Sequence, residues 1–223
     1  MHRIRRMRRL FYFETNLPHE FFWQLAKGAL CGYHREEKAH KGVPSGEGGR
    51  TIMKKAIVVV DMQKDFIDGA LGTKEAQAML PRMEAKLAAA RAAGTALVFT
   101  MDTHGEDYLT TQEGKRLPVP HCIRGTKGWE IAASLQPFVQ AAAAVVEKPS
   151  FGSTELPAVL AGYDEIELVG LCTDICVISN ALLLKAFYPE KRISVDASCC
   201  AGVTVESHED ALRAMKMCQV DVK

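Results

Sequence analysis

From residue 56 onward, short apolar runs rich in β-branched residues alternate with longer segments of helical spacing. The first run, Ala56–Val60, reads AIVVV and ends at Asp61. A continuous apolar run of this length predicts a strand that is buried on both faces. Further strands are expected at Ala96–Thr100, Ala143–Val146, Glu165–Val169, Arg192–Val195 and within Cys218–Val222, and helices at Leu80–Ala93, Thr126–Leu135, Thr154–Leu160, Ile175–Phe187 and Val205–Met217. Strands that alternate with helices predict an α/β fold, a three-layer α/β/α arrangement around a central, mostly parallel sheet.

The first 52 residues differ in charge from the rest of the chain. Residues 1–52 contain 10 Lys and Arg against 5 Asp and Glu, whereas residues 53–223 contain 18 against 22. We expect 1–52 to be a basic leader or linker outside the functional domain, which we place at 53–223; an arm that contacts a membrane or RNA is the alternative. The whole chain has a formal net charge of only +1, and its apolar runs are shorter than the ~18–20 residues of a membrane span. Neither nucleic acid nor membrane is therefore an expected partner.

The chain contains seven cysteines at irregular spacings. An odd number without the paired CxxC spacing of a zinc ribbon does not predict a disulfide framework. Free thiols are typical of proteins in a reducing compartment, so a cytoplasmic location is expected.

Three chemically reactive side chains follow predicted strands. Asp61 comes after the first strand, Lys148 after the third, and Cys176 lies at a strand-to-helix turn, where the helix dipole favours a thiolate. Because ligands bind at the carboxyl ends of parallel strands, these residues are expected at one edge of the sheet. Together they suit acyl transfer: Cys176 attacks, Asp61 moves the proton and Lys148 stabilises the charges. Taken singly, each has a structural alternative, as a turn residue, a surface lysine or an inert core thiol.

A second cluster suits a metal ion. Asp102 and His104 lie two residues apart on an extended segment and therefore point to the same side, and His121 follows seventeen residues later. Two imidazoles and a carboxylate are ligands for zinc, iron or manganese, and Glu113 adds a further carboxylate. The alternative for each histidine taken singly is an ordinary surface or core residue.

Five motifs in this order resemble the isochorismatase-like cysteine hydrolases, and the nicotinamidase branch in particular: VVVDMQKDF, TMDTHGEDY, PVPHCIRGT, EKPSFGST and GLCTDICV. The resemblance covers Lys54 to Val220. It implies a catalytic triad of Asp61, Lys148 and Cys176, a cis peptide bond before Cys172, and an oxyanion hole formed by the backbone N–H groups of Cys172 and Cys176. It also implies a divalent metal ion, with zinc expected first and iron or manganese as alternatives, held by Asp102, His104, His121 and Glu113.

The resemblance further implies hydrolysis of a small amide through a cysteine thioester, with nicotinamide converted to nicotinate and ammonia. Many nicotinamidases have a tryptophan where this chain has Pro118, and Phe66 is the aromatic residue expected against a planar substrate. A hydrolase of another small amide, or of a carbamoyl or ureido compound, is the nearest alternative. A non-enzymatic interaction module and a metal-binding redox or storage protein are alternatives of other classes. Family members often form dimers or tetramers, so a homo-oligomer is allowed.

Overall fold

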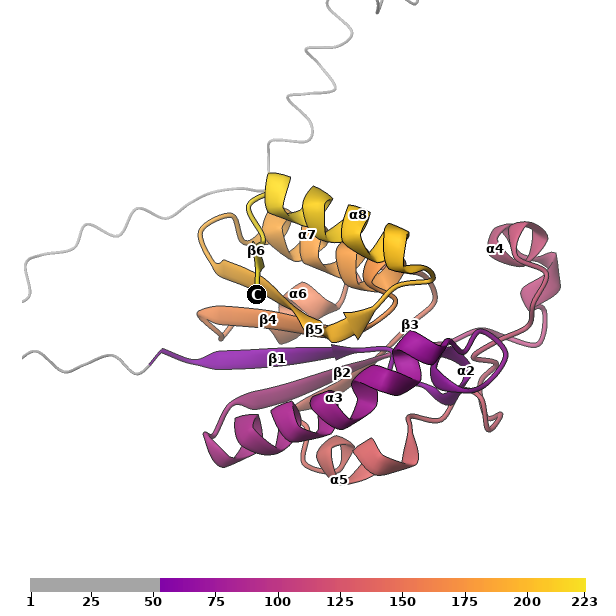
Figure 1. Ribbon diagram of the computed structural model, residues 1–223, viewed down its shortest axis with the longest axis horizontal. Coiled ribbons are helices and arrows are strands. Elements are labelled where there is room, and N and C mark those ends of the chain that lie inside the picture. The colour runs from indigo at the N-terminus through magenta and orange to yellow at the C-terminus, as the bar shows by residue number, and fades with distance from the viewer. Residues whose placement is uncertain (1–52) are drawn as a thin grey trace, which may run out of the picture. The chain divides into compact units, whose positions relative to one another are not determined.

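The computed structural model describes residues 53–223, so the expected leader or linker at 1–52 lies outside the described residues. A six-stranded sheet in the order β3-β2-β1-β4-β5-β6 forms the centre (Figure 1). The strands are β1 (Lys55–Val60), β2 (Ala96–Asp102), β3 (Ala144–Lys148), β4 (Glu165–Leu171), β5 (Arg192–Ala201) and β6 (Asp221–Val222). Every neighbouring pair runs parallel, which confirms the predicted fold class.

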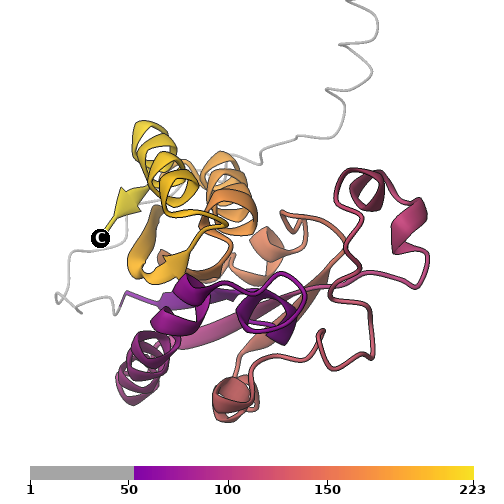
Figure 2. The same ribbon diagram turned by 45° about the vertical axis from the view of Figure 1, so that its right-hand side comes forward.

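Helices cover both faces of the sheet (Figure 1). On one face lie α3 (Lys74–Ala92) and α5 (Gln136–Val139), and on the other lie α6 (Leu156–Val159), α7 (Ile178–Phe187) and α8 (Val205–Met217). Shorter elements are α2 (Lys64–Ile67), α4 (Gln112–Arg116), the 3₁₀ turns Tyr108–Thr110 and Ala133–Leu135, and a π-helical turn, Thr173–Val177. The segment that carries α4 extends away from the sheet (Figure 2). Within residues 53–223, no helix has the length and apolar composition needed to cross a bilayer.

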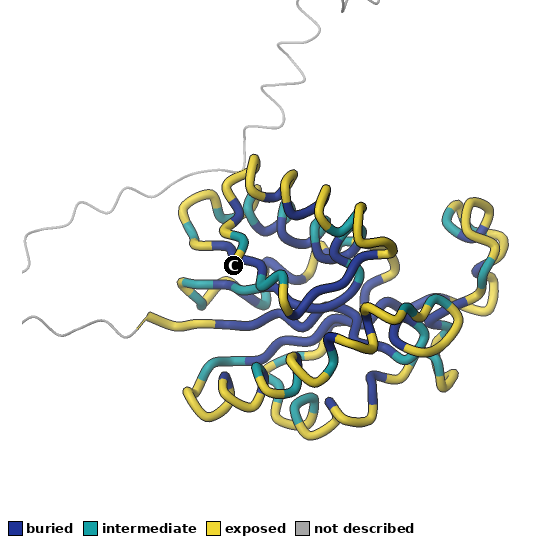
Figure 3. The backbone as a smooth tube through the Cα atoms, viewed as in Figure 1, coloured by how far each residue is buried: buried dark blue, intermediate teal, exposed yellow. Residues whose placement is uncertain are grey.

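Two apolar cores lie on opposite faces of the sheet. Ile57 and Val59 of β1 point into the core beneath α3, whereas Val58 and Val60 point into the core beneath α7 and α8. This alternation follows from the two-residue period of a strand, and it explains why β1 is apolar from Ala56 to Val60. The strands and the inner sides of the helices are accordingly buried (Figure 3).

The helix predicted at Thr126–Leu135 is wrong. The backbone N–H groups of Lys64 and Asp65 donate to the carbonyl oxygens of Glu130 and Gly128, and Ile131 forms an antiparallel bridge with Gln63. Carbonyl groups engaged in this way cannot accept helical hydrogen bonds from their own segment. Only the 3₁₀ turn that begins at Ala133 remains.

Several predicted elements differ from the observed ones at their ends. Helix α3 begins at Lys74, six residues before the predicted start at Leu80, because the Thr73 hydroxyl caps it by accepting from the N–H of Ala76. The helix predicted at Thr154–Leu160 is one turn, Leu156–Val159, and the helix predicted from Ile175 begins at Ile178, after the π-helical turn. Strands β2 to β5 extend past their predicted ends, so that Asp102 and Lys148 are the last residues of β2 and β3.

Gly170 lets β4 pass close to β1. Its φ of +119° is unfavourable for other residues, and a Cβ at this position would overlap the backbone of Val60. We expect Gly170→Ala to lower the free energy of unfolding by about 2–5 kcal/mol, since backbone strain and overpacking each cost about 1–3 kcal/mol. Urea unfolding curves measure this change. Gly162→Ala is the control because nothing lies within 4 Å of a Cβ there, and equal midpoints for the two variants would contradict the interpretation.

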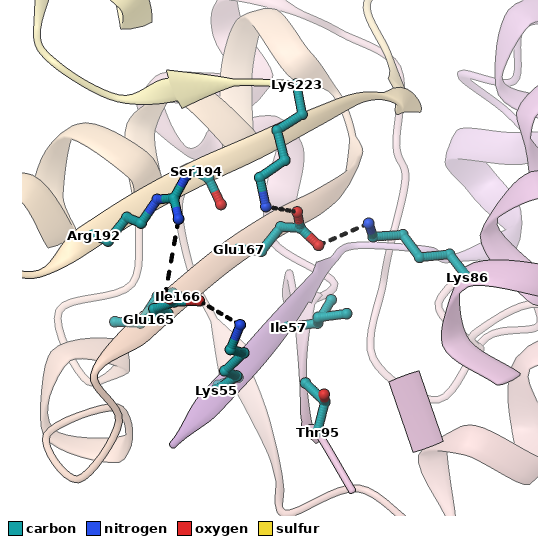
Figure 4. A pocket seen from close by; sticks show the side chains of 11 residues that line it. Lys55, Ile57, Lys86, Thr95, Glu165, Ile166, Glu167, Arg192, Ser194 and Lys223 are labelled. Atoms are coloured by element: carbon teal, nitrogen blue, oxygen red, sulfur yellow. Dashed lines mark hydrogen bonds and ion pairs between the residues drawn. The ribbon is translucent and has the colours of Figure 1, made fainter. Parts of the chain in front are cut away.

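A network of ion pairs lines a cavity of about 340 Å³ at the amino ends of β1, β4 and β5 (Figure 4). Glu167 lies between Lys86, at 2.7 Å, and Lys223, at 2.6 Å, while Glu165 pairs with Lys55 at 2.9 Å. Arg192 pairs with Asp221 at 2.8 Å. Because each cation that lines this cavity already has a carboxylate partner, the network links strands and α3 and leaves no excess charge for a ligand.

Candidate active site and metal centre

The chemically reactive side chains gather at the carboxyl ends of four neighbouring strands. Asp61 follows β1, Asp102 and Lys148 end β2 and β3, and Cys176 lies in the π-helical turn after β4. The strand order reverses between β1 and β4, which is where open α/β sheets bind ligands. The structure therefore brings together the residues that the sequence places at strand ends.

Lys148 lies at the centre of this group and is fully buried. Its Nζ atom is 2.7 Å from Asp61 Oδ2, 3.5 Å from Cys176 Sγ and 3.3 Å from Asp102 Oδ1, and it donates to the Ser150 carbonyl oxygen at 3.0 Å. A buried ammonium group is stable only when it is paired in this way. Lys148 thus holds the carboxylates and the thiol around one positive charge.

Asp61 is held in a left-handed backbone conformation with φ of 47°, which aspartate adopts more readily than most residues. Thr100 donates its hydroxyl to Asp61 Oδ1 at 2.7 Å. The other carboxylate oxygen of Asp61, Oδ2, forms the ion pair with Lys148 at 2.7 Å. Asp61 and Cys176 thus both contact the Lys148 ammonium group, which places the carboxylate beside the thiol.

The charge states of the three residues depend on burial. Burial raises the pKa of Asp61, and Lys148 opposes this rise. Burial also raises the pKa of the Cys176 thiol well above its ordinary value, and the Asp61 carboxylate adds to this, with only Lys148 acting in the opposite direction. Burial would lower the pKa of Lys148, but Asp61, Cys176 and Asp102 raise it above its ordinary value. Cys176 therefore rests as a thiol, and not as the thiolate that a helix start favours, so its attack requires a base.

The turn that carries Cys176 begins at a cis peptide bond between Leu171 and Cys172, as the sequence resemblance implies. The N–H groups of Ile175 and Val177 both donate to the carbonyl oxygen of Cys172. Cys172 and Cys176 thus stand at the start and near the end of one tight turn.

Side chains outside the motifs hold this turn in place. Asn180 Nδ2 donates to the carbonyl oxygen of Cys176 at 2.8 Å, and its Oδ1 accepts from the N–H of Ser153 at 2.9 Å. His208 Nδ1 is 2.8 Å from the Thr173 hydroxyl, and Asp174 accepts from Ser207. Asn180 and Cys176 are four residues apart, but the other contacts join segments that are far apart in the chain, which is why sequence reasoning missed them.

The four predicted metal ligands converge on one point. Suitable ligand atoms of Asp102, His104, Glu113 and His121 all lie within 4.8 Å of one another. His104 Nε2 is 2.9 Å from Asp102 Oδ2 and 3.7 Å from Glu113 Oε1, and His121 Nε2 is 3.7 Å from each of these oxygens. Burial raises the pKa of Glu113 and would raise that of Asp102, but His104 and Lys148 hold the pKa of Asp102 below its ordinary value.

Aromatic side chains and one carbonyl group fix the two imidazoles. His121 Nδ1 bonds to the Val119 carbonyl oxygen at 2.9 Å, which leaves Nε2 for a ligand. The buried Tyr108 ring lies 4.8 Å from His104 and 5.0 Å from His121, centroid to centroid. Phe66, expected against a substrate, is buried with its ring 5.5 Å from that of His121. Its contact with substrate stays a prediction.

A cavity of about 500 Å³ opens beside these groups. His104 and Glu113 line it together with a wall of Leu117, Phe151 and Ile175, the residue before Cys176. The remaining lining residues are Thr111, Gln112, Arg116, Pro149 and Ser150. Apolar pockets of this size with a few polar groups are typical of small-molecule sites. Sequence reasoning missed this wall, although Phe151 lies within the EKPSFGST motif.

Comparisons with known proteins agree with this geometry. The family model described as "Isochorismatase domain" matches residues 55–222. "Uncharacterized isochorismatase family protein PncA" from Bacillus subtilis is 31% identical, over 72% of this chain and 93% of that protein. The nicotinamidase/pyrazinamidase of Mycobacterium tuberculosis is 29% identical, over 75% of this chain and 97% of that protein. The crystal structure of the pyrazinamidase/nicotinamidase of Streptococcus mutans matches with a TM-score of 0.69 and 28% identity, over 76% of this chain and all of that one (100%).

Proposed function

Because the chain belongs to the isochorismatase family, we propose that it hydrolyses nicotinamide to nicotinate and ammonia through a thioester on Cys176. Its relatives that are named nicotinamidase/pyrazinamidase are hydrolases that act on amides, and this chain is an enzyme of that kind. The observation that carries the proposal is the position of the Lys148 Nζ atom, 2.7 Å from Asp61 and 3.5 Å from Cys176.

The proposed reaction has two halves. In the first, Asp61 accepts the thiol proton of Cys176, and the sulfur attacks the amide carbon to form a tetrahedral oxyanion. The backbone N–H groups of Cys172 and Cys176 stabilise this oxyanion, and Lys148 stabilises the thiolate. Collapse of the intermediate breaks the C–N bond, and Asp61 returns its proton to the departing ammonia. In the second half, Asp61 deprotonates a water molecule that attacks the thioester, and the carboxylic acid leaves as Cys176 regains its proton.

The residues of the second cluster fit a divalent metal ion, with zinc proposed first and iron or manganese as alternatives. Two imidazole nitrogens and two carboxylate oxygens within 4.8 Å form a donor set that suits these ions. When bound, the ion would act as a Lewis acid toward the ring nitrogen of the substrate. Asp102, His104, Glu113 and His121 would hold it, and the contact of Asp102 with Lys148 joins this set to the triad.

Removal of the metal tests this part of the proposal. We expect dialysis against a chelator to reduce nicotinamide turnover at least tenfold. Substitution of residues that only orient the ligands of a metal ion already costs roughly 10–100-fold in metal affinity or activity. Addition of zinc, manganese or iron(II) should restore turnover and raise the Tm, because a ligand that binds only the folded state stabilises it. His121→Ala should abolish the rise in Tm, whereas His208→Ala, outside the cluster, should retain it. Full activity of protein shown by elemental analysis to hold no metal would remove the metal from the proposal.

A carbamoyl or ureido compound hydrolysed by the same three residues is the second candidate, favoured by Pro118 in place of the aromatic residue that many nicotinamidases carry. A screen of ammonia release from nicotinamide, pyrazinamide and ureido compounds distinguishes the two. An interaction module would lack a triad residue, and a storage protein would leave Asp61 and Lys148 without a function. A cytoplasmic location, a homo-oligomeric state and the lack of nucleic-acid or membrane partners stay predictions.

A further inference from the structure

We infer that the site also takes amides that carry a carboxylate, and that Arg116 selects them. This inference rests on the proposed amide hydrolysis and extends it to a second class of substrate. The supporting observation is that Arg116 lines the same cavity as His104 and Glu113.

Arg116 has no carboxylate partner. Among the described residues, Arg124, Arg192 and Arg213 each pair with an acidic side chain, but no ion pair or side-chain hydrogen bond involves Arg116. It is the last residue of the short helix α4, and it is exposed. An arginine fork that faces a pocket without a partner is suited to bidentate recognition of a carboxylate on a ligand.

The charges around the cavity leave Arg116 uncompensated. Inside the site, Lys148 and Asp61 cancel each other at 2.7 Å. Asp102 and Glu113 belong to the candidate metal set, and a divalent ion there would neutralise both carboxylates. The lining then keeps one net positive charge, on Arg116, which attracts an anionic group rather than a neutral one.

The lining of the cavity also has an apolar part. Leu117, Phe151 and Ile175 form it, and all three are at least partly exposed; Leu117 follows Arg116 along the chain and Ile175 precedes Cys176. A volume of about 500 Å³ has room for more than a single-ring amide. The substrate class that matches is an amide with an apolar body, its amide directed to Cys176 and its carboxylate to Arg116.

Matched pairs of amides test the inference. In each pair a methyl group replaces the carboxylate: 4-carbamoylbenzoate with 4-methylbenzamide, and succinamate with butyramide. We expect the full-length, metal-loaded enzyme to show a kcat/KM at least roughly 10-fold higher for the acidic member of one pair or both, since a charge-assisted pair contributes about one order of magnitude. Arg116→Gln should remove most of this ratio. Lys115→Gln removes the same charge from the same helix, but Lys115 does not line the cavity, so the ratio should stay.

Three results would overturn the inference: no preference in the wild-type enzyme, a ratio that Arg116→Gln leaves unchanged, or an equal loss of the ratio in Lys115→Gln. Calorimetry of the same amide pairs binding to metal-loaded Cys176→Ala distinguishes a failure of this inference from a failure of the proposed hydrolysis. Selective binding that depends on Arg116, without turnover of any amide by the wild-type enzyme, would refute the hydrolysis and keep the assignment of Arg116. Turnover of nicotinamide without selective binding would refute the assignment of Arg116 and keep the hydrolysis.

Discussion

Cys176→Ala should abolish ammonia release from nicotinamide, with a fall in kcat of at least about 10⁴-fold, because a covalent mechanism cannot proceed without its nucleophile. The remaining donors and the cavity would still bind substrate, so KM should change far less than kcat. The measurement is an enzyme-coupled ammonia assay on the metal-loaded protein. Acid-quenched wild-type enzyme should in addition carry the mass of the nicotinoyl group on a peptide that contains Cys176.

Cys218→Ala is the matched control for this experiment. Cys218 is a free, exposed thiol at the end of α8, and it should be dispensable. A Cys176→Ala enzyme with full activity would eliminate the thioester pathway.

Asp61→Asn should reduce kcat by roughly 10²–10⁴-fold, the range that a positioned general acid–base contributes. The change preserves the shape of the side chain. Asparagine tolerates the left-handed φ of 47°, and its amide oxygen can still accept the Thr100 hydroxyl, so the fold should be retained. What disappears is the basic oxygen next to a thiol whose pKa burial has raised.

A second readout distinguishes a lost base from a disturbed fold. Alkylation of Cys176 by iodoacetamide, which requires the thiolate, should not slow in Asp61→Asn, because loss of the carboxylate charge removes one cause of the raised thiol pKa. A low kcat together with a reactive thiol and unchanged far-UV and near-UV circular dichroism spectra would identify a lost base. Asp68→Asn, at an exposed position after α2, provides the control with the same chemical change. Retention of more than a tenth of the wild-type kcat by Asp61→Asn would assign the proton transfer to another group.

The sequence predicted what depends on local patterns. The AIVVV run of β1 is apolar at each position because both faces of the strand are buried, and this can be read without any knowledge of its neighbours. The location of Asp61, Lys148 and Cys176 at one edge follows from the parallel direction of the strands. The positions of the site residues were thus accessible before any coordinates, while their chemical functions still need the experiments above.

What could not be predicted depends on contacts between distant segments. The chain at 126–132 resembles a helix in composition, but its carbonyl groups pair with the backbone of α2. Asn180 lies on an apolar helix, and only the fold places its Oδ1 atom against the N–H group of Ser153, 27 residues away. Tyr108 is only four residues from His104, but its contact with His121, thirteen residues further along the chain, gives no sequence signal because it depends on how the intervening loop folds back.

Asp102 belongs to both halves of the site. Its Oδ1 atom is 3.3 Å from Lys148 Nζ, and its Oδ2 atom is 2.9 Å from His104 Nε2. Substitutions at Lys148 and at the metal ligands are therefore expected to be non-additive, since each changes the partner that the other contacts. Loss of the histidines alone would leave both carboxylate partners of Lys148 in place, whereas loss of Asp102 would leave the buried ammonium group with Asp61 as its remaining carboxylate. Asp102 is therefore the residue through which evolutionary change at the candidate metal centre would reach the nucleophile.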